Sequence, residues 1–215
     1  MKNTSKKILL TVCSILLVAA SVMGTLAYFT SEDSAVNTFT VGKVAMTLDE
    51  APTDTAGKVV PGDRVQGNKY RLVPGATYTK DPTVHMDPAS ESSWVFVKVE
   101  NGIADIETAV EAKTIAYQIT KTHGWAELPD VEGIYYKAWN KGDEVDLKVF
   151  GSFTVDGDKA VNNGADGEKT FNIDDYNTEE NAESVITITG YAIQMAGFEG
   201  EPVKAWGALK TQNNL

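Results

Sequence analysis

The sequence contains little cysteine and little histidine. Its 215 residues include one cysteine, Cys13, and two histidines, His85 and His123. A lone thiol forms no disulfide within the chain, so the fold depends on a packed core. Zinc proteases of the His-Glu-x-x-His type need two imidazoles on one helix face, and the two histidines here are 38 residues apart. We therefore expect no catalytic residue and no zinc centre of this type, and a structural or solvent-exposed role for each histidine.

Basic residues are scarce after the N-terminus. The chain has 19 Lys and Arg against 30 Asp and Glu, a net charge of -11. Three of the basic residues (Lys2, Lys6, Lys7) lie in the first 27 positions, which leaves 16 basic and 30 acidic side chains, net -14, in the remaining 188. Nucleic acids and anionic membrane surfaces bind clustered Lys and Arg, so neither is an expected partner. The apolar share of 42% is still enough for a packed core.

One long hydrophobic run is present, from Ile8 to Met23. Its 16 residues are fewer than the roughly 18 to 20 of a membrane-spanning helix, and basic residues precede it. Small residues at Thr25 and Ala27 fit cleavage between Ala27 and Tyr28. Residues 1–27 are therefore predicted to form a signal peptide, an N-terminal signal helix that holds the precursor transiently in the membrane and removes Cys13 on cleavage. Cleavage after Ala20 and an uncleaved anchor remain alternatives.

The rest of the chain has the alternating pattern of strands. Apolar residues recur at every second position in six stretches bounded by Gly, Pro, Asn and Asp: Phe39 to Leu48, Trp94 to Val99, Thr114 to Thr120, Ile134 to Trp139, Val145 to Val155 and Ser184 to Gln194. One face of the second stretch is wholly β-branched, which predicts a core face. Short helices are expected at Ala104 to Ala112 and Glu201 to Leu209, and loops at Asp49 to Asn68 and Asp156 to Glu183. These patterns predict an all-β fold, an antiparallel jelly-roll-like sandwich with one or two short helices, as a single domain over residues 39–215.

Several short segments, in the same order along the chain, resemble those of one protein family. The junction from Gly24 to Thr30, followed by Asn37 to Gly42, resembles that of TasA and camelysin-type proteins, which Gram-positive bacteria export through the SipW class of signal peptidase. Further segments resemble the clostridial branch of this group: Leu72 to Gly75, Lys80 to Val84, Val95 to Val99 and Thr189 to Gln194. The resemblance extends from the signal to the last predicted strand, except for about residues 102–182.

The resemblance implies a secreted subunit of the cell surface or biofilm matrix. In TasA-like proteins the segment freed by the signal peptidase inserts as a strand into the neighbouring subunit, and repeated head-to-tail contacts of this kind give a fibre. Residues 28–38 are then an N-terminal arm and candidate donor strand, whose apolar groups are Tyr28, Phe29, Val36 and the adjacent Phe39. The expected partners are other copies of the chain and the SipW-type peptidase, with no membrane contact after cleavage. The alternative for the arm is a strand that packs on its own subunit.

Two other functions stay open. Camelysin is classed as a metallopeptidase, so a camelysin-type surface peptidase is one alternative, although no zinc motif supports it. A monomeric exported binding module is the other. Its carbohydrate platform would be lined by aromatic residues, unless these pack in the core: Trp94, Trp125, Tyr135, Tyr136, Trp139 and Trp206.

No cofactor is expected, and calcium has only a weak signal. Six carboxylates fall within 20 residues of the second loop: Asp156, Asp158, Asp166, Glu168, Asp174 and Asp175. Calcium takes six to eight oxygen ligands from such segments, but the spacing does not match the EF-hand. A solvated acidic loop is the favoured alternative.

Overall fold

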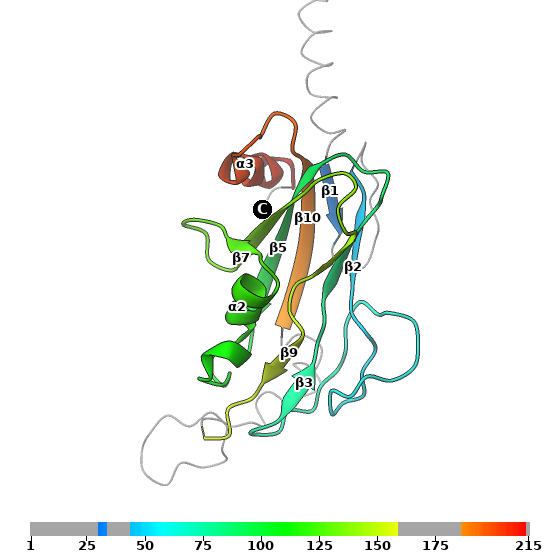
Figure 1. The fold of residues 1–215 in the computed structure, drawn as a ribbon. Coiled ribbons are helices and arrows are strands. Elements are labelled where there is room, and N and C mark those ends of the chain that lie inside the picture. The colour runs from blue at the N-terminus through cyan, green and yellow to red at the C-terminus, as the bar shows by residue number, and fades with distance from the viewer. Residues whose placement is uncertain (1–29, 34–43, 159–185, 214–215) are drawn as a thin grey trace, which may run out of the picture.

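A computed structural model describes residues 30–33, 44–158 and 186–213. This part of the chain consists mostly of antiparallel strands with short helices, so the predicted all-β class is confirmed (Figure 1). The predicted signal helix and cleavage site lie outside the described residues.

The larger sheet has five strands in the order β1-β10-β5-β7-β6. Its centre is β5 (Ser93–Asn101), which pairs along its full length with β10 (Ile186–Gln194). On the other side β5 pairs with β7 (Ile134–Trp139), and β7 pairs with the short β6 (Ala126–Glu127). The strand β1 (Thr30–Asp33) lies at the opposite edge, beside β10.

The second layer is built from shorter strands. One group has the order β2-β4-β8, with β2 at Met46–Asp49, β4 at Thr83–Met86 and β8 at Asp146–Lys148. The other pairs β3 (Thr77–Thr79) with β9 (Ser152–Thr154). Backbone hydrogen bonds from Lys80 N to Gly151 O and from Val149 N to Pro82 O connect the two groups, so β3 leads into β4 opposite β8 and β9.

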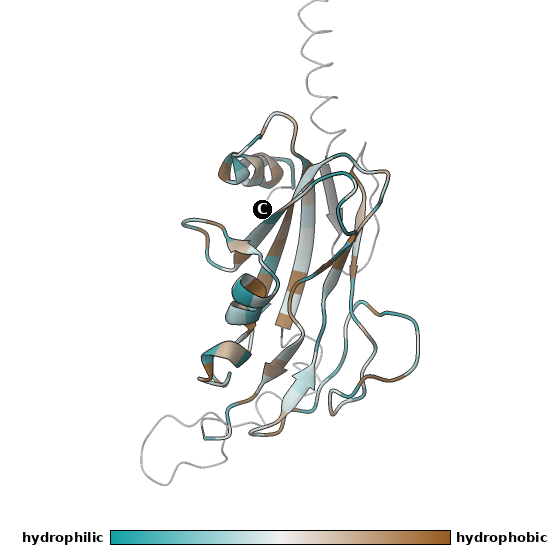
Figure 2. Ribbon diagram, viewed as in Figure 1, coloured by the Kyte–Doolittle hydropathy of each residue, from teal (hydrophilic) through white to brown (hydrophobic). Residues whose placement is uncertain are grey.

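Apolar side chains from both layers form one core. The predicted core face of β5 is confirmed, because Val95, Val97 and Val99 are buried in this cluster. Opposite them lie apolar residues of the second layer, including Met46, Val84 and Phe153. Figure 2 shows apolar residues along β5 and β10 in the middle of the molecule.

The other face of the large sheet is covered by a helix. The predicted C-terminal helix is confirmed as α3 (Pro202–Asn213), with proline in its first turn, where a missing N–H costs no hydrogen bond. Ala205, Trp206 and Leu209 of α3 pack on Phe96 and Tyr191 of the sheet. Both faces of β5 and β10 are therefore buried at this end.

Two predictions between residues 104 and 120 are wrong. The expected helix at Ala104 to Ala112 is instead irregular, with turns, a β-bridge from Glu107 to Val155, and a 3-10 turn that includes only its last two residues. The expected strand at Thr114 to Thr120 is helical, in α2 (Ile115–Tyr117) and the π-helical turn η2 (Gln118–Thr122), after a 3-10 turn η1 (Glu111–Lys113). The buried residues Ile115, Gln118 and Ile119 have helical spacing, which the alternation of Ile115, Tyr117 and Ile119 conceals.

The remaining predictions differ mainly at their boundaries. The stretch Val145 to Val155 is two strands, β8 and β9, separated at Val149 to Gly151. The predicted loop Asp49 to Asn68 is irregular after Asp49, which ends β2, and is held by bridges from Glu50 to Val65 and from Thr53 to Val59. Within it, Gly57 has φ +76, and a Cβ there would lie 2.8 Å from Tyr78 Cα, so only glycine fits. Short strands β3, β4 and β6 were not predicted.

Candidate functional site

The edge of the large sheet at β10 is formed by the N-terminal strand β1. The two strands are antiparallel, with Thr30 opposite Ile193 and Asp33 opposite Gly190. Figure 1 shows β1 beside β10 and close to β2, at the seam between the two layers. A segment of the predicted N-terminal arm therefore adds a strand to the sheet.

β1 covers only part of β10. It pairs with four of the nine residues of β10, Gly190 to Ile193, whereas β5 pairs with all nine. The covered residues, Gly190 to Ile193, are all buried, while Thr187 is exposed and Ile188 and Thr189 are half-buried. In the described part of the chain no strand pairs with this outer side of Ile186 to Thr189. An edge of this kind presents backbone N–H and C=O groups that can accept another strand.

Most of the predicted arm lies outside the described residues. This applies to Ala27 and Tyr28 at the predicted cleavage site and to Phe29, Val36 and Phe39 of the predicted donor strand. The described portion, Thr30 to Asp33, pairs with β10 of its own chain. Sequence reasoning drew attention to the apolar residues around it, whereas the observed pairing is made by the backbone of four polar residues.

The predicted calcium loop is described only at its start. Asp156 Oδ1 accepts a hydrogen bond of 2.8 Å from the backbone N–H of Asp158, which closes a local turn. Asp166, Glu168, Asp174 and Asp175 lie outside the described residues, so calcium binding stays a prediction. Within residues 30–33, 44–158 and 186–213, no three His, Cys, Asp or Glu side chains are grouped to hold a metal ion.

His85 lies on β4 between two carboxylates. Its Nδ1 is 2.7 Å from Asp146 Oδ1 and its Nε2 is 2.9 Å from Asp49 Oδ1. Burial acts to lower the pKa of His85, but hydrogen bonds to Asp146 and Asp49 outweigh it, and the pKa is raised from 6.5. Arg64 also donates to Asp49 and lies 3.3 Å from Asp81. The alternating charges tie β2, β4 and β8 together.

His123 has a different environment. It follows the π-helical turn η2, as expected for a residue before Gly124 in a turn. Burial and the nearby Lys148 and Lys137 ammonium groups lower the pKa of His123, so its neutral form is favoured.

The six aromatic residues considered for a carbohydrate platform pack inside the molecule. Trp94, Trp125, Tyr135, Trp139 and Trp206 are buried, and Tyr136 is half-buried against the cluster under α3. Tyr135 and Tyr136 belong to opposite faces of β7, because Tyr135 packs in the core between the layers. These rings do not form a surface platform.

A buried polar group at the end of β3 was not foreseen. Lys80 is 7% exposed and Glu50 is 3% exposed, and Lys80 Nζ lies 2.8 Å from Glu50 Oε2. Asn68 Nδ2 donates to Glu50 Oε1 at 3.0 Å. Lys80 drew attention in the sequence only as part of a segment that resembles a family. Lys and Glu are almost never buried unless they are paired, so neither residue was predicted to lie in the interior.

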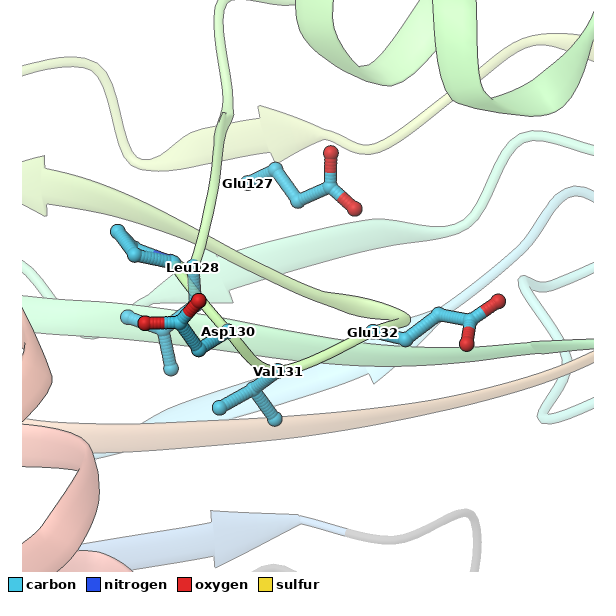
Figure 3. A pocket seen from close by; sticks show the side chains of 6 residues that line it. Glu127, Leu128, Asp130, Val131 and Glu132 are labelled. Carbon is cyan, nitrogen blue, oxygen red and sulfur yellow. The ribbon is translucent and has the colours of Figure 1, made fainter.

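The described part of the chain also has a surface hollow at the β6–β7 turn, whose polar side chains do not converge. It is lined by residues 127–132, and Figure 3 shows the side chains of Glu127 and Glu132 extending to one side and that of Asp130 to the other. Leu128 is buried, and Val131 packs against the cluster under α3. The turn therefore serves the packing of the sheet.

Comparisons with known proteins give no relative to set beside this geometry: no family model, no curated protein and no solved structure matches the chain. In the three described ranges, no helix has the length and apolar character needed to cross a membrane.

Proposed function

We propose that this protein is an exported, TasA/camelysin-like subunit of the cell surface or biofilm matrix that self-assembles into fibres by strand addition. In this proposal the two layers form a jelly roll, and SipW-type cleavage after Ala27 releases the arm. The observation that carries the proposal is the pairing of Thr30 to Asp33 with the edge of β10.

The physical basis is exchange of one strand between identical sites. The same backbone hydrogen bonds form whether β1 comes from its own subunit or from a neighbour, so exchange costs little interaction energy. Ten residues separate Asp33 from Val44, a segment that spans about 35 Å when extended. That length is sufficient to reach an adjacent molecule. In the described part of the chain no strand pairs with the outer side of Ile186 to Thr189, so an incoming arm would find further backbone groups there.

A pair of cysteines at opposed positions tests where the strand comes from. Ser31 lies directly opposite Ala192, and directly opposed residues of antiparallel strands have Cα atoms within disulfide range. The chain from Tyr28 onward contains no cysteine, so the variant Ser31→Cys with Ala192→Cys has only these two thiols. Filaments assembled under reducing conditions and then oxidised should give a ladder of covalent multimers on a non-reducing denaturing gel.

The controls use the same chain. Ser31→Cys alone should give nothing larger than a dimer, and deletion of Tyr28 to Val36 should leave a folded monomer without filaments in electron micrographs. A monomer band from oxidised filaments, filaments from the deletion variant, or no filaments from the unaltered chain would each contradict the proposal.

A further inference from the structure

The buried residues Lys80 and Glu50 and the half-buried Asn68 form a contiguous group that has the parts of an amide-forming site. Glu50 follows β2, Lys80 follows β3, and Asn68 comes from the intervening loop. One carboxylate contacts both other groups: Glu50 Oε2 is 2.8 Å from Lys80 Nζ, and Glu50 Oε1 is 3.0 Å from Asn68 Nδ2. The amine of Lys80 and the carboxamide of Asn68 therefore each contact a different oxygen of the same carboxylate, which can accept and donate protons.

The carboxamide of Asn68 is fixed and polarised. Its Oδ1 accepts a hydrogen bond of 2.7 Å from the backbone N–H of Thr53, and its Nδ2 donates to Ala51 O at 2.9 Å. A backbone N–H at the carbonyl oxygen stabilises the negative charge that develops there when a nucleophile attacks the carbon. The arrangement therefore activates Cγ of Asn68 as an electrophile.

Aromatic side chains lie beside Lys80. The ring centroid of Tyr70 is 5.9 Å from Lys80 Nζ. Tyr70 packs edge-on against Tyr78 and Phe153, and all three rings are buried. Glu50 Oε2, 2.8 Å from Lys80 Nζ, is placed to accept a proton from the lysine. A neutral amine is the form of lysine that acts as a nucleophile.

We propose that Lys80 and Asn68 become joined by an intramolecular amide bond, with Glu50 as the proton-transfer group. A proton passes from Lys80 Nζ to Glu50, and the neutral amine attacks Asn68 Cγ. The Nζ–Cγ bond forms, and the Cγ–Nδ2 bond breaks as Glu50 passes protons to the departing nitrogen. Nζ loses two protons in total, the leaving group departs with both as ammonium, and Glu50 ends as the carboxylate. No oxidant or cofactor is consumed, and the proposal does not depend on fibre formation.

Mass spectrometry of the purified full-length chain tests the bond. Loss of one ammonia lowers the intact mass by about 17 Da. Trypsin cuts after Lys and Arg, so a linked chain should give a branched peptide in which Val65 to Lys69 is joined to Leu72 to Lys98, with Lys80 uncut. Recovery of linear Val65 to Lys69 and Leu72 to Lys80 at full yield would overturn the proposal.

Variants separate the proposed bond from other losses of ammonia. Asn101-Gly102 and Asn163-Gly164 can also lose ammonia by forming succinimides, but these give no branched peptide. Glu50→Gln and Lys80→Met should each abolish the branched peptide, whereas Asn140→Ala, at an exposed asparagine that also contacts a carboxylate, should retain it in full. A branched peptide that persists in a folded Lys80→Met variant would also overturn the assignment, and the peptide map of the unaltered chain decides the question even where a variant fails to fold.

Discussion

At the scale of single residues, the most demanding feature is buried charge. Glu50 and Lys80 are almost fully enclosed, and removing two charges from water costs several kcal/mol each unless their remaining polar atoms are satisfied. Asn68 supplies the second contact to Glu50. Loss of Lys80 or Glu50 would therefore leave the other charge buried without its partner.

His85 is a second charged residue whose state depends on its neighbours. Carboxylates on both ring nitrogens raise its pKa above 6.5. The imidazolium therefore stabilises the folded protein fully below about pH 6.5, and this stabilisation is lost as the pH rises through the raised, folded-state value. His85→Gln should lower the free energy of unfolding by about 1 kcal/mol at about pH 5.5, because the site is partly exposed, and by less at about pH 9.

Urea unfolding at the two pH values measures this difference. The matched control is His123→Gln, which removes a histidine whose pKa is lowered. Protonation of His123 favours the unfolded chain, so this substitution should not lower the free energy of unfolding more at about pH 5.5 than at about pH 9. An effect of His85→Gln that grows with pH would contradict the assignment of a charged His85.

At the scale of elements, strands were predicted correctly where alternating apolar residues are buried on one or both faces of the strand. Ile134 to Trp139 is β7 at the predicted bounds, and Trp94 to Val99 lies within β5. It failed at Thr114 to Thr120, where Thr114 Oγ1 accepts the N–H of Tyr117 and caps a helical turn. The same seven residues satisfy both periods, and the contacts of Ile115 and Ile119 with the core, together with this cap, favour the helix.

The helix α3 is held by one large aromatic side chain. Trp206 is 5% exposed and lies 5.3 Å from Phe96 and 5.4 Å from Tyr191 between ring centroids. Trp206→Ala should therefore lower the free energy of unfolding by about 3–5 kcal/mol. Val203→Ala, on the exposed side of the same helix at 52% exposure, should change it by no more than about 0.5 kcal/mol.

Thermal and urea unfolding of the two variants check this expectation. Equal effects at both positions would show that α3 is not docked on the sheet through Trp206.

At the scale of the whole molecule, net charge opposes assembly. The 188 residues after Ala27 carry a net charge of -14, so subunits repel one another at low ionic strength. Raising sodium chloride from about 0.01 to 0.15 M shortens the screening length from about 30 to 8 Å. If the proposed fibre forms, its growth measured by light scattering should accelerate over this range.

Divalent ions separate screening from binding. At equal ionic strength, calcium and magnesium should accelerate growth equally if the acidic loop is only solvated, whereas a calcium-specific increase together with a higher melting temperature would indicate a site there. Slower growth at higher salt would contradict a repulsion-limited assembly.

Periodicity and capping depend on neighbours along the chain, so the residues alone predicted the all-β class, the core face of β5 and a C-terminal helix from Glu201 to Leu209, which the structure has at Pro202–Asn213. The tertiary structure alone decided that Thr30 to Asp33 pairs with a strand some 160 residues away, and that Lys80 and Asn68 meet on Glu50. Strand partners and the burial of polar groups depend on contacts between distant segments, and no local pattern records them. Tertiary contacts also decide the turn of helix at Ile115, because the residues there fit the strand and the helix pattern equally well.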